Sequence, residues 1–183
     1  STVDFAATKF SNPLFFFKKQ LIFILLGFVV LYVITHIKTN FYYDYGKYFL
    51  LLSLIISLLV HIPGLGVTIN GATRWINLGF FTLQVSEVSR LFFFIWLSGY
   101  ISRNDFNKNY LKIFLFLSIL MLAIVSQRDF GSMILLFVAF IIFSFLSHVR
   151  IMHLLKVLSL AIIPILLLIV MYPYRIQRLL AFI

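Results

Sequence analysis

Long apolar stretches and short polar segments follow one another along the whole chain. A membrane-spanning helix needs about 20 apolar residues. Stretches close to this length cover residues 20–37, 48–62, 85–101, 111–126, 130–147 and 157–171. They are too continuous for the alternating pattern of a membrane β-barrel, so helices must satisfy the backbone inside the lipid. The pattern predicts an all-α fold, a polytopic membrane helix bundle with about six transmembrane helices.

The polar segments between these stretches form the predicted loops. Residues 38–47 and 102–110 make two of them, and residues 63–84 make the longest. No internal repeat divides the chain, so residues 1–183 are predicted to form a single transmembrane domain. The chain starts without a methionine and stops abruptly, and we expect it to be an excerpt that is incomplete at both ends.

Glu87 and Arg90 stand unusually close to a lipid-spanning segment. Only the uncharged residues 91–102 separate Arg90 from Arg103. At 1.5 Å per residue this stretch is about 18 Å long, well short of the ~30 Å hydrocarbon core of a bilayer. The span must therefore begin upstream, which draws Arg90 and Glu87 to the membrane edge or into the protein interior.

Arg128 and Asp129 mark a predicted turn between two spans. One continuous helix through the uncharged stretches 113–127 and 130–149 would be about 55 Å long, nearly twice the hydrocarbon thickness. The chain should therefore reverse its direction here. With six successive crossings, one side of the membrane collects Arg74, Glu87, Arg90, Arg128, Asp129, Arg175 and Arg178.

Composition supports the membrane assignment and adds an excess of positive charge. Hydrophobic residues make up 63% of the chain, and the mean hydropathy is +1.10. The net charge of +10 is spread over the loops and forms no tract for nucleic acid. It suits either anionic lipid headgroups or an anionic substrate, and both interpretations stay open. The two faces carry eight and seven basic residues, so the positive-inside rule does not orient the chain.

Glu87 and Arg90 are the first candidates for chemistry. They lie three positions apart, so on a helix they share a face and can form an ion pair. Ser86 and Glu87 also suit the first turn of a helix, where a carboxylate meets the positive end of the helix dipole. Ionisable groups near lipid usually serve function, and we favour a functional role for the pair.

Asp129 and the Arg74-Trp75 dipeptide each have two interpretations. Asp129 precedes a long apolar helix, so it is either a simple N-cap or a second carboxylate for acid–base chemistry beside Glu87. Trp75 is either an anchor at the membrane interface or, with Arg74, part of a re-entrant loop over a substrate groove, where the guanidinium grips phosphate.

Several classes of enzyme are not supported by the sequence. The chain contains no nucleotide-binding loop, dinucleotide fingerprint or zinc-hydrolase motif. It has no Cys, and its four His show no metal-ligand spacing. No metal site is therefore predicted. An enzyme of this composition would act on a substrate that arrives through the membrane and carries its own activated leaving group.

Four segments of the chain resemble a known family. GATRWINLG followed by QVSEVSR resembles the pattern G-A-x-R-W-I-x-L-G…Q-P-S-E-x-x-K of the SEDS family, of FtsW/RodA type. QRDFGS resembles its Q/E-P-D-[LF]-G-[TS] segment, PYRIQRLLAFI the stretch entering its large extracytoplasmic loop, and NPLFFFKKQ the segment before its second helix. The four occur in the family's order across nearly the whole chain, and the first two are specific together.

The resemblance implies a fold of ten helices, of which this excerpt is similar to helices two to seven. It implies a multi-pass protein of the bacterial inner (cytoplasmic) membrane, with residues 63–84, 127–131 and 172–183 extracytoplasmic. The family's activity is polymerisation of lipid II, a disaccharide peptide on undecaprenyl pyrophosphate, into peptidoglycan glycan strands. Implied partners are lipid II, a class B penicillin-binding protein transpeptidase and membrane lipids, with no nucleic acid.

Matching positions carry over residue by residue. Glu87 matches the motif glutamate and Asp129 the PDxG aspartate, and we expect supporting catalytic roles for both. Arg74 and Trp75 match the RW pair, while Arg90 stands where a lysine is usual. The implied substrate-binding residues are Arg74, Trp75, Gln84, Ser86 and Arg90.

The chain also departs from the family pattern. Val85 and Arg128 replace prolines, and Arg90 exchanges a point charge for a planar fork. The family's essential carboxylate lies in the large loop that begins here near Tyr172, so the resemblance implies a catalytic base beyond this chain and an inactive fragment. Arg74, Arg90 or a divalent cation would stabilise the leaving pyrophosphate. No other cofactor is expected.

Two alternatives to a polymerase remain. A flippase or transporter of lipid-linked cell-wall precursors would also need charges at membrane depth and an anionic lipid partner. A non-catalytic scaffold of the division machinery would need neither Glu87 nor Asp129. Within the family, the NGATRWINLG and FFFKKQ segments favour the division-type (FtsW) branch over the elongation-type (RodA) branch.

Overall fold

The computed structural model describes residues 14–69, 71–79 and 81–159. Its elements, in chain order, are α2 (Phe15–His36), α3 (Thr39–Asp44), α4 (Gly46–Leu59), β1 (Gly66–Ile69), β2 (Ala72–Asn77), β3 (Thr82–Gln84), α5 (Val85–Ile101), α6 (Phe106–Ser126) and α7 (Phe130–Leu146). The chain divides into two compact units, residues 1–42 and residues 43–183. The charged candidates in the described ranges belong to the second unit.

Five of the six predicted apolar stretches are helices, namely α2, α4, α5, α6 and α7. By length and composition α2 and α6 suffice to cross a membrane, and α4 and α7 are shorter apolar helices. Between its first turns and its last turn, α2 is apolar on every face, as in a lipid-spanning helix. Most of the predicted stretch 157–171 lies outside the described residues. The short helix α3, in the predicted loop 38–47, was not expected.

The all-α prediction needs one correction, because residues 63–84 were predicted to be a loop and contain a small sheet. Its antiparallel strands lie in the order β1-β2-β3. Ile69 pairs with Ala72, so only two positions of the sequence, 70 and 71, separate β1 from β2. In a sequence, Asn-Gly between runs of β-branched residues is a strong signal for a hairpin, and this signal was not used when residues 63–84 were predicted to be a loop.

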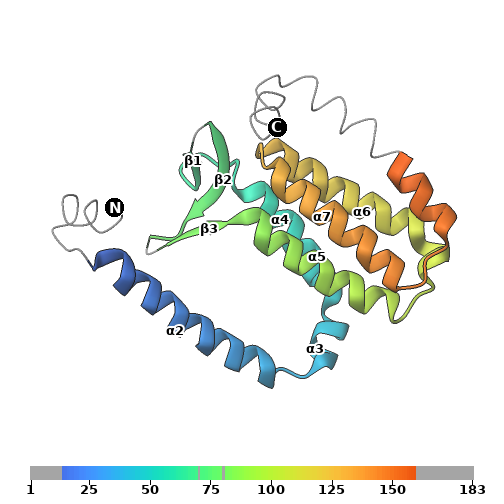
Figure 1. Cartoon of the computed structure of the whole chain (residues 1–183), viewed down its shortest axis with the longest axis horizontal. Coiled ribbons are helices and arrows are strands. Elements are labelled where there is room, and N and C mark those ends of the chain that lie inside the picture. The colour runs from blue at the N-terminus through green and yellow to red at the C-terminus, as the bar shows by residue number, and fades with distance from the viewer. Residues whose placement is uncertain (1–13, 70, 80, 160–183) are drawn as a thin grey trace, which may run out of the picture. The chain divides into compact units, whose positions relative to one another are not determined.

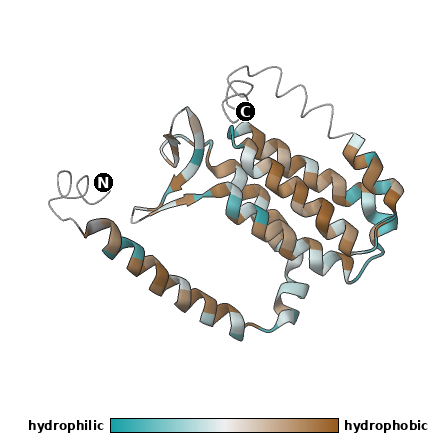
Figure 2. Cartoon of the chain, in the orientation of Figure 1, coloured by the Kyte–Doolittle hydropathy of each residue, from teal (hydrophilic) through white to brown (hydrophobic). Residues whose placement is uncertain are grey.

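The second unit is built around a helical core. In Figure 1, α5, α6 and α7 run side by side, with α4 beside α5. Ile113, Leu117, Leu120 and Ile124 recur at helical spacing on α6 and are fully buried. They pack in one cluster with residues of α5 and α7, including Phe93. Figure 2 shows that the outer faces of α6 and α7 are also largely hydrophobic, as expected for helices in contact with lipid.

A second, smaller cluster joins the sheet to the helices. Ile76 of β2 packs with Val60, just after α4, and with Val85, the first residue of α5. Because β3 ends at Gln84 and α5 begins at Val85, no linker separates the strand from the helix. The hairpin is therefore attached to the helices at the end where α5 begins.

The close contact between α4 and α5 depends on small buried side chains. Ser53, Ser57 and Ser89 are fully buried, and the Oγ atoms of Ser57 and Ser89 lie 2.8 Å apart. Small residues allow membrane helices to approach closely.

We expect Ser89→Leu to lower the free energy of unfolding by about 1–3 kcal/mol through overpacking, measured as thermal unfolding in detergent. Leu122→Ala is the control, because Leu122 is exposed, and an unchanged transition for Ser89→Leu would contradict the close packing.

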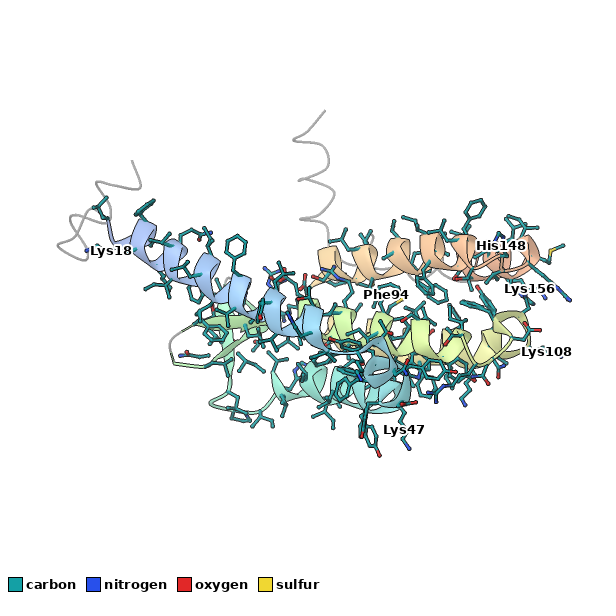
Figure 3. The ribbon with its side chains drawn as sticks, turned by 90° about the horizontal axis from the view of Figure 1, so that it is seen from below. Lys18, Lys47, Phe94, Lys108, His148 and Lys156 are labelled. Atoms are coloured by element: carbon teal, nitrogen blue, oxygen red, sulfur yellow. The ribbon has the colours of Figure 1, made fainter. Side chains whose placement is uncertain are left out.

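The opposite end of the helices is basic. Figure 3 shows Lys108, His148 and Lys156 together at one end of the second unit. This is the end where α6 begins and α7 ends. Glu87 is in the first turn of α5, and Asp129 caps the start of α7. Both residues therefore lie at the opposite end of the helical core. The structure therefore separates the two groups of charges along the helix axes.

Candidate functional site

Asp129 lies in the tight turn between α6 and α7. α6 ends at Ser126 and α7 begins at Phe130, as the prediction of a chain reversal required. The Asp129 carboxylate accepts a hydrogen bond from the Ser132 backbone N–H at 3.3 Å. The predicted N-cap is thereby confirmed. Asp129 is also only 3% exposed, which a cap on a surface turn does not require.

Two further donors reach the same carboxylate from the start of α5. The Ser86 hydroxyl donates to Oδ2 at 2.7 Å, and the Gln84 side-chain amide donates to Oδ2 at 3.1 Å. Gln84 ends β3, and Ser86 lies in the first turn of α5. The positive ends of α5 and α7 thus meet at one carboxylate, an arrangement that stabilises negative charge.

The ionised form of Asp129 is favoured. Burial raises the pKa of this carboxyl, but hydrogen bonds from Ser86, Ser132 and Gln84 lower it by more, so that the pKa lies below its usual value. A carboxylate with this pKa is charged at neutral pH. It is suited to holding neighbouring groups in place, and poorly suited to taking up a proton.

Arg74 of β2 is the cation beside this carboxylate. Its Nη1 atom lies 3.5 Å from Asp129 Oδ1, and its side chain is 34% exposed. Its Nε is buried without a hydrogen-bond partner. Since Asp129 already accepts three closer hydrogen bonds, it does not depend on Arg74 to stay charged. The guanidinium therefore retains capacity to bind another anion.

The structure does not bring every candidate together. Arg74, Gln84, Ser86 and Asp129 form one cluster, referred to below as the Asp129 cluster. Trp75 is half-buried one position along β2, where its backbone pairs with Gln84. Counting successive crossings predicted that the charged residues gather on one side, and Arg74, Glu87 and Asp129 do lie at one end of the unit. Arg175 and Arg178, predicted for the same side, lie outside the described residues.

The ion pair that the spacing of Glu87 and Arg90 allows is not formed among the described residues. Glu87 is exposed and Arg90 half-buried, and the ion pairs in residues 14–69, 71–79 and 81–159 join other residues. An exposed pair gains little from Coulomb attraction and loses side-chain entropy when it orders. Glu87 does lie in the first turn of α5, so its predicted position near the positive helix end is confirmed.

Sequence reasoning did not assign Ser132 or Gly71 to the site, and it named Arg128 only as a charged residue of the predicted turn on this side. The Ser132 hydroxyl lies 3.1 Å from that of Ser86, and Arg128 Nη1 donates to the Gly71 carbonyl at 2.8 Å. The spacing of Ser132, three residues after an N-cap, was a usable signal for the first. The Asn-Gly hairpin signal would have placed Gly71 in a turn. The contact of Arg128 with Gly71 had no local signal.

The described residues do not fit a metal site. No group of three His, Cys, Asp or Glu side chains in this part of the chain is placed to hold an ion. Both Asp129 oxygens already accept hydrogen bonds. The divalent cation that the resemblance allows would need ligands from outside the described residues, and no step is assigned to one.

The lowered pKa predicts how stability depends on pH. Ionised Asp129 stabilises the fold above its unfolded pKa of about 3.9, and this contribution is lost as the pH falls through its lower folded pKa. Asp129→Asn should therefore lower the melting temperature by a constant amount between about pH 5 and 8. Below about pH 4, the gap between the melting temperatures of the wild type and the variant should narrow. Asp44→Asn is the control, because the Asp44 side chain is 64% exposed. A gap that widens on acidification would contradict the assignment.

Comparisons with known proteins identify relatives of this chain. A relative in Nitrosococcus halophilus, "Probable peptidoglycan glycosyltransferase FtsW", is 35% identical over 100% of this chain and 48% of its own length. One in Wigglesworthia glossinidia brevipalpis has the same name and is 32% identical over 100% of this chain and 49% of its own. Both bear the division-type name that the sequence favoured. The chain spans about half the length of the curated relatives it matches.

A solved structure shows the same fold. The crystal structure of Thermus thermophilus rod shape determining protein RodA matches with a TM-score of 0.69 and 20% identity, over 80% of this chain and 49% of that one. The family model described as "Cell cycle protein", covering FtsW, RodA and SpoVE, matches residues 1–183. As the motifs of the Arg74 and Asp129 segments predicted, the chain belongs to the FtsW/RodA/SpoVE family.

Proposed function

We propose that the whole protein is a peptidoglycan glycosyltransferase that polymerises lipid II, and that this chain supplies one wall of its active site. The observation that carries the proposal is the Asp129 cluster. A buried, fully hydrogen-bonded carboxylate holds a partly exposed arginine at one end of an apolar helix bundle. A lipid-linked pyrophosphate combines the two features such a site would bind, an anionic head and a long apolar tail. The names of the relatives support the same activity.

The proposed reaction is a displacement at the anomeric carbon of the donor sugar. A carboxylate of the whole protein takes the proton from the acceptor hydroxyl. The hydroxyl oxygen forms a bond to the anomeric carbon, and the bond from that carbon to the pyrophosphate oxygen breaks. The leaving pyrophosphate keeps the electron pair, and Arg74 and Arg90 stabilise its charge.

The remaining candidates take supporting roles. Ser86 is fully buried and donates to Asp129, so we assign it, with Gln84, to holding the carboxylate instead of touching substrate. Trp75 lies beside Arg74 on β2 and is proposed to contact the sugar or the interface. Glu87 is exposed in the first turn of α5, where it is proposed to orient the acceptor.

We place the Asp129 cluster on the extracytoplasmic side of a bacterial inner membrane, with about six spans crossing it. The opposite end of the second unit then faces the cytoplasm. This orientation rests on the family resemblance, because the positive-inside rule does not orient the chain. The basic residues described at or near that end are Lys47, Arg103, Lys108, Lys112, Arg150 and Lys156. A class B penicillin-binding transpeptidase is proposed as the partner that cross-links the product strands.

The test is a polymerisation assay on the purified full-length protein with lipid II in detergent, alone and with the partner transpeptidase. Glycan strands seen on a gel support the proposal. Absence of strands in both reactions, together with lipid II translocation in proteoliposomes, would replace it with the flippase alternative. Absence of both activities would leave the scaffold, which also predicts that Glu87→Ala leaves growth unchanged.

A further inference from the structure

The turn between α6 and α7 holds the β1–β2 hairpin at two points. Arg128 Nη1 donates to the Gly71 carbonyl at 2.8 Å, and the neighbouring Asp129 lies 3.5 Å from Arg74 Nη1. Gly71 and Arg74 are three residues apart on the hairpin. Two consecutive residues of one turn thus hold the tip of the hairpin and the middle of β2 separately.

We propose that Arg128 is a positioning residue that holds the hairpin in place, referred to below as the clamp. With the hairpin held, the Arg74 guanidinium can leave Asp129 and bind an anionic ligand while β2 keeps its position. This inference rests on the proposed role of Arg74 as a ligand for the substrate pyrophosphate. The two contacts differ in the way this role requires. The Arg128 contact is a short, charge-assisted hydrogen bond to the backbone, whereas the Arg74 contact is long and joins two side chains.

The backbone of Arg128 adopts an uncommon conformation. Arg128 has a φ of 58°, in the left-handed region that an arginine rarely adopts. Residues held in such conformations persist when their surroundings determine them, and they concentrate at functional sites. This φ directs the turn so that residue 128 faces the hairpin while residue 129 caps α7. A proline cannot adopt this φ, so the turn here requires something other than the proline of the family pattern.

The hairpin end of the clamp is equally constrained. Gly71 has a φ of 74°, and a Cβ built on it would lie 3.6 Å from Arg128 Nη1. The guanidinium therefore sits directly against the tip of the turn. At the other end of β2, Ile76 packs on Val60 and Val85. The clamp and this apolar cluster hold β2 on both sides of Arg74.

The test compares Arg128→Ala, Arg128→Gly and Arg128→Lys in the full-length protein. Both Ala and Gly remove the guanidinium. Ala keeps the Cβ that makes the positive φ unfavourable, whereas Gly adopts a positive φ without strain. If the guanidinium acts as a clamp, both variants should speed amide hydrogen exchange in residues 66–77 about fivefold. Lys should give a smaller increase, because an ammonium lacks the planar fork.

Kinetics and stability separate the clamp from a general structural role. The Ala and Gly variants should raise KM for lipid II about fivefold with little change in kcat, since weaker holding of Arg74 reduces binding of both substrate and transition state. The melting temperature should be unchanged, because Arg128 is exposed. Exchange as slow as in the wild type for either variant, or a lowered melting temperature with unchanged KM, would overturn the clamp. A wild-type protein without polymerase activity would end the proposed function, while the exchange measurement would still decide the clamp.

Discussion

Replacing Asp129 with alanine is expected to lower the free energy of unfolding by about 2–4 kcal/mol, the largest stability effect in the site. The change removes the cap of α7 and the acceptor for Ser86 and Gln84 at once. The Ser86 hydroxyl is fully buried, and the Ser132 hydroxyl, 3.1 Å away, would be its remaining acceptor in this cluster. Lipid II polymerisation should fall together with stability, because Arg74 loses the carboxylate beside it.

The measurement is thermal unfolding of the full-length protein in detergent, with Asp129→Asn as the graded variant. Asparagine retains one oxygen, so it should cost less than alanine. Asp105→Ala is the matched control, because Asp105 also caps a helix by accepting from two backbone N–H groups of α6, but at the opposite end of the unit. A smaller loss for Asp129→Ala than for Asp105→Ala would show that the buried network adds nothing to a simple cap.

Replacing Arg74 with alanine is expected to lower the polymerisation rate about 100-fold, the largest effect on activity. Removal of one preorganised donor to a developing negative charge typically has this magnitude. Stability should change little, since Asp129 keeps hydrogen bonds from Ser86, Gln84 and Ser132. Arg74→Lys should be intermediate, because lysine keeps the charge and loses the bidentate geometry.

The assay is polymerisation of lipid II by full-length variants, with the melting temperature measured on the same samples. Arg103→Ala is the control, because Arg103 forms an exposed ion pair with Asp44 at the opposite end. Wild-type rates for Arg74→Ala would end its proposed role at the pyrophosphate. A drop in melting temperature as large as that of Asp129→Ala would instead identify Arg74 as a structural counter-ion.

The helices were predictable because their signal is local. Apolar runs and the charged breaks between them gave the start of α5 at residue 85 and of α7 at residue 130. The α6–α7 turn followed from length alone, since no helix through Arg128 and Asp129 fits the bilayer. The sheet was missed because its strands have only three to six residues, too few for a periodicity to stand out from a loop.

The site was predictable in its members and less so in its contacts. Motif resemblance pointed to Arg74, Ser86 and Asp129. The spacing of Glu87 and Arg90 allowed an ion pair, which is not formed among the described residues. The actual partner of Asp129 on α5 is Ser86, 43 positions earlier in the chain. Which face of the first turn of α5 points inward depends on how β3 leads into it, and this is a property of tertiary packing that a single segment does not encode.

The direct junction between β3 and α5 makes the strand and the helix a single mechanical element. Gln84 pairs with Trp75 across the ladder, and the very next residue begins a helix of 17 residues, about 26 Å long at 1.5 Å per residue. Because β3 continues directly into α5 and pairs with β2, we expect a rotation of α5 about its own axis to displace β3 and the strand bearing Arg74. Through this junction, a displacement at the far end of α5 would change the electrostatic field at the Asp129 cluster.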